Sequence, residues 1–194
     1  MTELDPTPSS GDNLSGHFLI AMPNLVDSIF SHSVTYICDH NEHGAMGIVI
    51  NQTLEATYDD VFKQLSLDPA AQVNTDTPVL AGGPVNPQQG FVLHRNEGKW
   101  DSTLQVSEEI CLTTSRDIVA ALANDCAPAG AQFALGYAGW SAGQLEEELS
   151  ANSWLTVPAN SSIIFDTPVQ ERWNAASKHI GVDLNLICSQ AGHA

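Results

Sequence analysis

The amino-acid sequence predicts one domain of the α+β class. The chain has 194 residues, and domains usually contain about 50 to 250 residues. Apolar residues make up 43% of it, enough to build a sizeable core. β-favouring runs and helical runs alternate irregularly, and hairpin-like strand pairs predominate in the first half. We therefore expect a sheet with helices packed against it, and not a doubly wound parallel sheet.

The first part of the chain is expected to be strand-rich. Residues 1–15 are rich in Pro, Ser, Asp and Gly, which predicts a disordered lead, and residues 16–194 then form the domain. "HFLIAMP" reads as a short strand, and "NLVDSIFSHS" as a loop with a helical turn. "VTYICDH" and "AMGIVIN" are two strands, and "NEHG" between them is a hairpin signal.

A helix and four strands are expected next. "TYDDVFKQLSL" places Val61, Phe62 and Leu65 at three- and four-residue spacings, which is one face of a helix. Residues 68–77 are polar and predict a loop. Four short apolar runs bounded by turn residues then predict strands: "PVLAGG", "GFVLHR", "STLQV" and "ICLTT".

The last third is predicted to hold three helices and two strands. Thr114 or Ser115 caps the helix of "RDIVAALAND", and "AQFALGYAG" is a strand. Ser141 and Gln144 form a capping box for the helix of "LEEELSANSW". "SIIFD" is expected to be a strand.

The final helix has start and stop signals of its own. Thr167 acts as its cap, followed by a proline at the first helical position, and Gly181 ends it. Its apolar face consists of Val169, Trp173, Ala176 and Ile180.

Composition excludes several classes of function. The formal charge is −17, from 23 acidic and 6 basic residues, whereas affinity for nucleic acids depends on Lys and Arg. Direct nucleic-acid binding is therefore disfavoured, as is adsorption to an anionic membrane. No apolar run approaches the roughly 20 residues that span a bilayer, and the N-terminus lacks the features of a signal peptide. Four cysteines without C-x-x-C spacing indicate free thiols in a reducing cytosol, so we expect a soluble cytoplasmic protein.

The stretch "CDHNEH" gathers ligand types that zinc favours. His40 and His43 are three residues apart, with Asp39 and Glu42 beside them. On a strand the two histidines face opposite sides, and no second Cys or His pair completes a tetrahedral set. We interpret the stretch as an exposed polar turn and expect neither a metal nor a cofactor.

Three further stretches carry groups that bind ligands in other proteins. Gly82 and Gly83 can form an anion nest, although a strand-terminating turn with positive φ explains them as well. Arg116 stands at a helix start, where anions bind, although capping and surface exposure explain that stretch too. "LGYAGWSAGQLEEEL" turns from a strand into a helix. It lacks a G-x-S-x-G nucleophile elbow, and its glutamates are expected mostly on a solvated face, although one could point into a cleft.

These stretches together resemble the AlgH/YqgE family of bacterial proteins. The resemblance rests on "GHFLIAMPNLVDSIF", "VTYICDHNEHGAMGIVIN", "VLAGGPV", "GFVLH", "TTSRD", "LGYAGWSAGQLEEEL", "WLTVP", "ERWNAASKHIGVD" and "AGHA", in the expected order. It implies an α+β fold in which a mixed, bifurcated sheet curls into a pseudo-barrel with helices packed against it. The family has no firmly assigned activity. One branch is labelled a transcriptional regulator of alginate biosynthesis, and the acidity of this chain favours an indirect effect over promoter binding.

The positions that carry this resemblance, together with nearby polar residues, are the candidate ligand-binding residues. They are His40, Asn51, Gly82, Gly83, Thr114, Arg116, Gly136, Tyr137, Trp140 and Gln144.

Three hypotheses about function follow from these residues. The first is a regulatory module, a monomer or weak homo-oligomer, that binds a small anionic molecule or a protein partner. The second is a hydrolase or transferase with His40 as general base. The third is a purely structural interaction protein. Convergence of His40, Arg116 and Tyr137 on one pocket would favour the first two. A nucleophile or carboxylate beside His40 would favour the enzyme.

Overall fold

The computed structural model describes residues 13–23, 25 and 28–181. This part contains ten strands, five α-helices and one 3₁₀-helix. The strands are β1 (His17–Ala21), β2 (Val34–Asn41), β3 (Gly44–Val49), β4 (Thr53–Thr57), β5 (Pro78–Ala81), β6 (Val85–Arg95), β7 (Thr103–Gln105), β8 (Ile110–Thr113), β9 (Gln132–Ser141) and β10 (Trp154–Pro158). The helices are α1 (Tyr58–Gln64), α2 (Arg116–Ala123), α3 (Gln144–Ser150), α4 (Ser161–Phe165), the 3₁₀-helix η1 (Val169–Glu171) and α5 (Arg172–Ile180).

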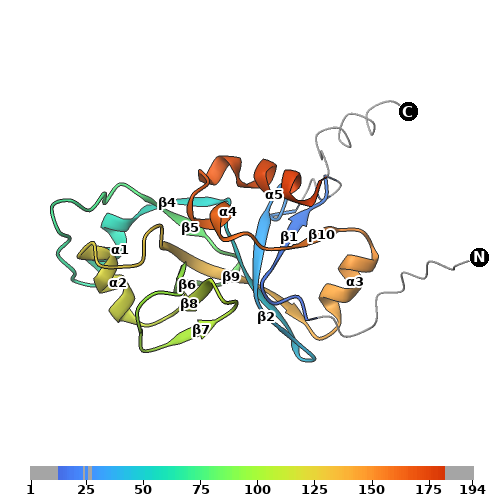
Figure 1. Cartoon of the computed structure of the whole chain (residues 1–194), viewed down its shortest axis with the longest axis horizontal. Coiled ribbons are helices and arrows are strands. Elements are labelled where there is room, and N and C mark those ends of the chain that lie inside the picture. The colour runs from blue at the N-terminus through green and yellow to red at the C-terminus, as the bar shows by residue number, and fades with distance from the viewer. Residues whose placement is uncertain (1–12, 24, 26–27, 182–194) are drawn as a thin grey trace, which may run out of the picture.

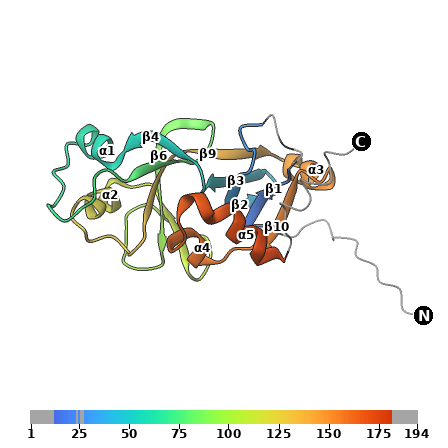
Figure 2. The ribbon, with the colours of Figure 1, turned by 90° about the horizontal axis from the view of Figure 1, so that it is seen from above.

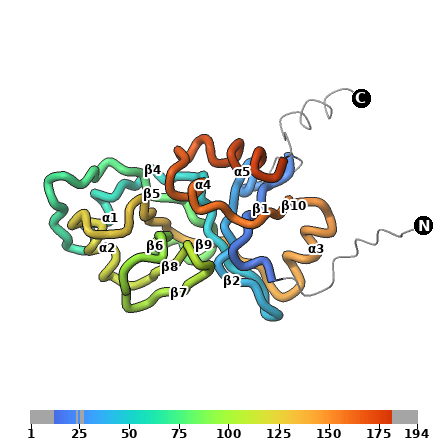
Figure 3. The backbone as a smooth tube through the Cα atoms, in the orientation of Figure 1, coloured from blue at the N-terminus to red at the C-terminus, as the bar shows by residue number. Residues whose placement is uncertain are grey.

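Strand β9 is the axis of the molecule. It runs from the end that carries α1 and α2 to the end that carries α3, while α4 and α5 cover one face between them (Figure 1). The view from above shows the same lengthwise path of β9 (Figure 2). Helices α1 and α2 lie side by side at one end, although they are far apart along the chain (Figure 3).

The sheet is bifurcated, as the family resemblance predicts. Its main path runs β10-β1-β2-β3-β9-β6-β8-β7, and all of these pairs are antiparallel. A branch leaves at β9, which pairs in parallel with β5, and β5 in turn pairs with β4. The curled sheet and its helices confirm the α+β class.

Three glycines make the branch sterically possible. A Cβ on Gly83 would lie 2.1 Å from the carbonyl carbon of Tyr137, and one on Gly136 would lie 2.2 Å from the Gly83 oxygen. A Cβ on Gly82 would lie 2.3 Å from the Gly136 oxygen. Gly83 (φ +154°) and Gly136 (φ +72°) also adopt backbone conformations that other residues rarely reach. The two backbones therefore touch at this crossing, which only glycine permits.

The apolar residues form three clusters that follow this plan. One lies between the sheet and α4 and α5, one lies beneath α1 and α2, and one packs against α3. Burial of these faces removes apolar surface from water, the main favourable contribution to folding. The predicted face of the last helix is confirmed, since Val169, Trp173, Ala176 and Ile180 all pack in the first cluster.

Arg172, the first residue of α5, is a buried cation with neutral oxygen partners. Only 2% of it is exposed. Its Nε donates to the Thr167 oxygen (3.0 Å), and its Nη1 donates to the Ile50 oxygen and to Gln132 Oε1 (2.8 Å). Burial lowers the pKa of the guanidinium to about 10, so it still carries a proton at neutral pH. The side chain ties α5 to the ends of β3 and β9.

The stretch "SIIFD" is a helix and not the predicted strand. Asn160 caps α4, because its Oδ1 accepts the N–H of Ser162 at 3.0 Å. The isoleucines favour a strand locally, but the helix buries Ile163, Ile164 and Phe165 in the central cluster. Tertiary packing therefore overrides the local preference.

The start of α3 also differs from the prediction. Gly143 (φ +77°) is the N-cap, and Ser141 is the last residue of β9. The Ser141 N–H still donates to Gln144 Oε1 at 3.0 Å, which is one half of the predicted box. In the same region the structure adds a strand that was not predicted, β10, at the edge of the sheet beside β1.

The prediction that Thr167 caps the last helix is wrong as well. A turn of 3₁₀-helix, η1, precedes α5, and the Thr167 hydroxyl donates back to the Ser162 oxygen. By contrast, Ser115 is the N-cap residue of α2, and Gly181 (φ +81°) ends α5 in the left-handed conformation, as predicted.

At the N-terminal end, Leu14 already packs against the cluster under α3, although it falls within the predicted lead. Residues 1–12 of that lead lie outside the described part of the chain. None of the helices described is long and apolar enough to cross a membrane.

Candidate functional site

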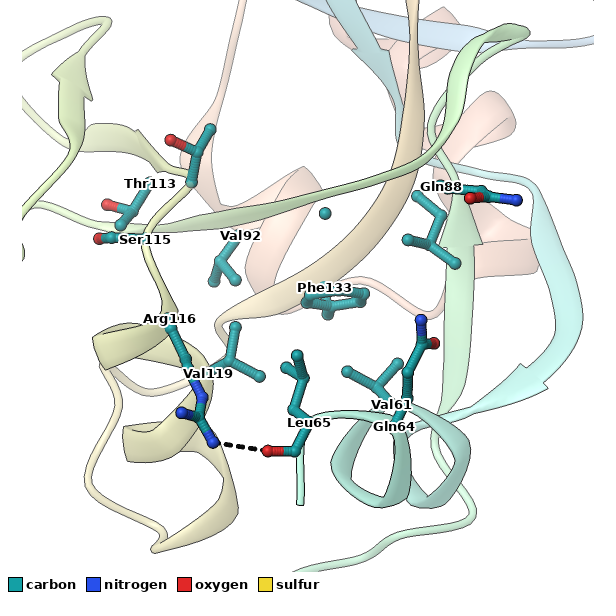
Figure 4. Close-up of a pocket in the computed structure, with 13 residues that line it drawn as sticks. Val61, Gln64, Leu65, Gln88, Val92, Thr113, Ser115, Arg116, Val119 and Phe133 are labelled. Atoms are coloured by element: carbon teal, nitrogen blue, oxygen red, sulfur yellow. Dashed lines mark hydrogen bonds between the residues drawn. The ribbon is translucent and has the colours of Figure 1, made fainter. Parts of the chain in front are cut away.

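A cavity of about 190 Å³ lies between α1, α2 and the sheet. Figure 4 shows Phe133 at its centre, Arg116 and the hydroxyl residues on one side, and Gln64 and Gln88 on the other. Its lining comes from α1, β6, β9, and the junction of β8 with α2. The lining residues are Val61, Gln64, Leu65, Gln88, Gly90, Val92, Thr113, Thr114, Ser115, Arg116, Val119, Phe133 and Leu135.

The apolar wall of the cavity is held in place by its neighbours. The ring of Phe133 lies against Gly90, since a Cβ there would come within 2.7 Å of the ring. The Phe133 N–H donates to the Tyr58 hydroxyl at 2.9 Å, and Tyr58 packs edge-on against Phe62. The aromatic surface is therefore fixed from both sides.

Arg116 supplies the positive charge of the cavity. Its Nη2 donates to the Leu65 oxygen, at the C-cap of α1 (Figure 4). It forms no ion pair with any described residue. A guanidinium has five N–H donors in a planar fork, so most of its donors stay available.

Three other polar side chains line the cavity without a protein partner. Thr114, Gln64 and Gln88 make no side-chain hydrogen bond to the part of the chain that the structure describes. Ser115 differs from these three because its hydroxyl has partners: Oγ accepts the Ser102 N–H and donates to Asp117. The cavity thus combines a fixed apolar wall with several available donors.

Asp117 closes the N-terminal end of α2. It accepts hydrogen bonds from Ser115 Oγ, from the Asp101 N–H (2.8 Å) and from the Ile118 N–H (2.9 Å). Burial alone would raise the pKa of this carboxyl, but these hydrogen bonds outweigh it and the pKa lies below its usual value. The helix start is therefore already occupied by a negative charge, and Asp117 itself does not line the cavity.

His94 stands behind the cavity wall. Its Nδ1–H donates to the Arg95 oxygen (2.7 Å), and its Nε2 accepts from the Thr113 hydroxyl (2.8 Å). Burial lowers the pKa of His94, so the imidazole is neutral. Thr113 is fully buried, and its hydroxyl also bonds Thr103 at 2.7 Å. These contacts anchor β6, β7 and β8 to one another.

His40 lies at the other end of the molecule, on β2, where its ring is hydrogen-bonded to both α3 and the N-terminal segment. Its Nδ1 accepts the Leu14 N–H (3.0 Å), so its Nε2–H donates to Glu146 (2.8 Å). The ring is 8% exposed, against 55% for Glu146. Hydrogen bonds from its own backbone N–H and from His40 lower the pKa of Glu146. A carboxylate does stand beside His40, but these contacts leave no ring nitrogen available as a base.

Glu148 forms a second set of hydrogen bonds that hold α3 to the sheet, through a clasp of its carboxylate on two indoles. Its Oε2 accepts the N–H of Trp140 (2.9 Å) and that of Trp154 (2.8 Å), while its Oε1 accepts from Gln144 (3.0 Å). Both indoles are buried in the cluster against α3. Two of the three glutamates of α3 thus bind the body of the protein, and Trp140 and Gln144 are occupied by this contact.

Asn51 and Tyr137 have structural partners too. The amide of Asn51 accepts from the Val34 N–H (2.7 Å) and donates to the His32 oxygen (2.8 Å). The ring of Tyr137 packs edge-on against Phe91, with centroids 5.8 Å apart. Gly82 and Gly83 serve the strand crossing, and the Gly82 N–H donates to the Leu135 oxygen. No anion nest is therefore needed to explain them.

Of the ten candidate residues, only Thr114 and Arg116 line the cavity. His40, Arg116 and Tyr137 do not converge on the cavity, and this scattered arrangement favours the third hypothesis, an interaction protein, for His40 and Tyr137. A binding role can therefore rest only on the cavity beside Arg116 and Thr114. Nothing in the sequence indicates that Gln64, Gln88, Gly90 and Phe133 line a cavity. Only the helical face that contains Val61 and Leu65 gave a signal, and it was assigned to the core.

Within residues 13–23, 25 and 28–181, no three His, Cys, Asp or Glu side chains gather where a metal ion could bind. His43 and Glu42 are both 86% exposed on the hairpin turn. Cys38, Cys111 and Cys126 are free thiols, and burial raises the pKa of Cys38. Cys188 lies outside the described residues.

Comparisons with known proteins agree with this architecture. The AlgH-like family model matches residues 18–185. A UPF0301 protein of Saccharophagus degradans is 60% identical over 182 residues, which cover 94% of this chain and 89% of that protein. A UPF0301 protein of Thioalkalivibrio sulfidiphilus is 50% identical over 186 residues, covering 96% and 100%.

Two solved structures share the fold. The solution structure of the AlgH protein from Pseudomonas aeruginosa is 44% identical, with a TM-score of 0.77 and complete coverage of both chains. The crystal structure of protein DIP2367 from Corynebacterium diphtheriae has a TM-score of 0.69 over 96% of this chain and 93% of that chain. At 20% identity, the second likeness concerns the fold alone.

Proposed function

The chain belongs to the AlgH-like family, and from that premise we propose that it is a binding module for a small anionic molecule. The ligand occupies the cavity between α1, α2 and the sheet. One observation carries the proposal: the cavity joins a fixed apolar wall to a guanidinium without an ion pair among the described residues. Apolar pockets with a few convergent polar groups are the usual form of small-molecule sites.

The charge distribution supports an anionic ligand. The chain has 23 acidic residues and only 6 basic ones, yet no carboxylate lines this cavity and one of the six cations does. Against a net charge of −17, a nearby acidic group would repel an anion strongly. Around Arg116 that repulsion is locally reduced, because no carboxylate lines the cavity.

A regulatory effect would then be indirect. The scarcity of basic residues disfavours promoter binding, whereas ligand occupancy can alter how α1 and α2 are presented to a protein partner. Arg116 already bridges these two helices through Leu65. A cytoplasmic monomer or weak homo-oligomer fits this role.

The alternative of a hydrolase or transferase with His40 as general base receives less support. A base needs a nitrogen lone pair within reach of the substrate, and both nitrogens of His40 are engaged. His40 also does not line the cavity.

The test is protein-observed NMR with a library of small anionic and neutral compounds. Binding is expected to shift the amide signals of Gly90 and of residues 114–116. A Val119→Phe variant fills the cavity from α2 and should lose these shifts while keeping its fold. As a control, Leu54→Phe enlarges an exposed apolar residue elsewhere and should keep them. If no compound shifts these signals at about 1 mM, a concentration that detects affinities of only about 4 kcal/mol, the proposal fails.

A further inference from the structure

We infer that the cavity is built for a monocarboxylate whose body is small, flat and apolar. The inference rests on the proposed function and specifies its ligand. It assigns the carboxylate to Arg116 and Thr114, and the body to the wall formed by Phe133 and the neighbouring aliphatic residues. Each part follows from a separate feature of the cavity.

The position of Arg116 suits a carboxylate. A guanidinium binds carboxylates through two parallel N–H···O bonds, which is stronger and more directional than a single contact. One edge of the group is held by the Leu65 oxygen, so the side chain is oriented before a ligand arrives. The hydroxyl of Thr114 stands two residues away, also at the cavity. Preorganised donors reduce the entropy lost on binding.

The surroundings favour one negative charge over two. Asp117 has its pKa lowered by hydrogen bonds and is therefore ionised at the start of α2. Its carboxylate accepts the Ile118 N–H, so the helix dipole is already complemented. Arg116 is the one cation that lines the cavity, so a phosphate dianion would keep one of its two charges uncompensated. A carboxylate leaves a balanced pair.

The size and wall of the cavity define the body of the ligand. A volume of about 190 Å³ equals about six times the roughly 30 Å³ share of a water molecule in the liquid, below the ~300 Å³ of drug-sized sites. The apolar wall consists of Val61, Leu65, Val92, Val119, Phe133 and Leu135. Because Gly90 lacks a side chain, the ring of Phe133 can lie close to the backbone at this position. A flat ring or short branched chain fits such a space.

The amides of Gln64 and Gln88 lie across the cavity from Arg116 (Figure 4). Without a hydrogen-bond partner among the described residues, they are available for a polar substituent at the far end of the body. This feature separates hydroxylated or amide-bearing ligands from plain hydrocarbons, and it adds specificity to the apolar contact.

The experiment compares three probes that share a phenyl ring by NMR titration of the full chain: benzoate, benzamide and phenyl phosphate. Benzoate is expected to bind at least about tenfold more tightly than benzamide, because a charge-assisted pair replaces a neutral contact. It should also exceed phenyl phosphate. The Arg116→Gln variant should lose the advantage of benzoate over benzamide, whereas Lys178→Gln, which removes an exposed cation on α5, should retain it.

The outcomes separate this inference from the proposed function. If benzamide binds at the cavity as tightly as benzoate, or if Arg116→Gln leaves the preference intact, the ligand class is wrong while the cavity remains a binding site. If phenyl phosphate binds best, the monoanion argument fails. If none of the three probes shifts the signals of the cavity, the ligand class is wrong, and the compound library decides separately whether the cavity binds any small anion.

Discussion

The clasp formed by Glu148 gives the sharpest stability prediction. Its carboxylate accepts three hydrogen bonds, from the indoles of Trp140 and Trp154 and from the amide of Gln144. We expect Glu148→Gln to lower the free energy of unfolding by about 2–3 kcal/mol. The amide oxygen can keep both indoles, but each bond loses its charge assistance, worth about 1 kcal/mol, and the new NH₂ faces the NH₂ of Gln144.

Glu147→Gln is the matched control. Glu147 is the next residue of α3, and its exposed side chain has no hydrogen bond to the described residues. The Glu147→Gln substitution removes the same charge from the same helix, and surface substitutions of this kind usually change the free energy of unfolding by no more than about 0.5 kcal/mol.

The assay is urea unfolding followed by tryptophan fluorescence, supported by thermal unfolding. For a chain of this size, about 1 kcal/mol corresponds to a shift of roughly 2–4 °C in Tm, so Glu148→Gln should melt about 4–12 °C below the wild type. The slope of the urea transition should not change, since the same surface is exposed on unfolding. If the two variants unfold within about 0.5 kcal/mol of each other, the carboxylate does not hold the indoles and the reasoning is refuted.

Three other changes test the fold and its charges. Gly83→Ala should lower the free energy of unfolding by more than about 4 kcal/mol, because its Cβ would lie 2.1 Å from the Tyr137 backbone. The control is Gly143→Ala, which has positive φ but nothing within 4 Å of its Cβ and should cost only about 1–2 kcal/mol. Equal losses of stability in urea unfolding would contradict the steric role of Gly83 at the strand crossing. Arg172→Met should lower the free energy of unfolding by about 3 kcal/mol or more, since it leaves buried oxygens unsatisfied. Its urea unfolding should be compared with that of Lys178→Gln, which should change the stability little. Asp117→Asn should destabilise the protein at pH 7. Because the folded pKa of Asp117 lies below its unfolded value, its contribution is complete above about pH 4 and is lost as the pH falls through the folded pKa; a gap between variant and wild type that did not narrow on acidification would refute this.

The sequence predicts elements well where local and tertiary preferences agree. The hairpin of β2 and β3, the cap of α2 and the glycine that ends α5 all follow from turn and capping chemistry. It fails where packing decides. Ile163 and Ile164 of α4 are β-branched and favour a strand, but a cap at Asn160 and burial against the central cluster produce a helix. Strand β10 was missed for another reason: the helix predicted from "LEEELSANSW" extends to Trp154, whereas α3 ends at Ser150 and Trp154 begins the strand that pairs with β1.

The cavity could not be located from the sequence. Its lining comes from α1, β6, β9 and the junction of β8 with α2, segments that β9 and the sheet branch bring together. Arg116 and Thr114 were found because a helix start is a recognisable place for an anion contact. Phe133 reads as an ordinary core residue of a strand, and Gln64 and Gln88 read as ordinary surface. Nothing local distinguishes them from such residues.

The contrast between motif and cavity has a physical explanation. The stretches that mark the family are dense in glycine and in paired polar residues, and the structure gives most of these a task in the fold. Gly82, Gly83 and Gly136 allow the sheet to branch, while His40 and Glu148 lock α3 in place. Substitution at such positions is costly, because the alternative is a steric clash or a buried unsatisfied group. A ligand contact instead can vary with the ligand. Family motifs of this kind therefore identify the scaffold, and under the proposed function the specificity of this protein lies in the lining between α1 and α2.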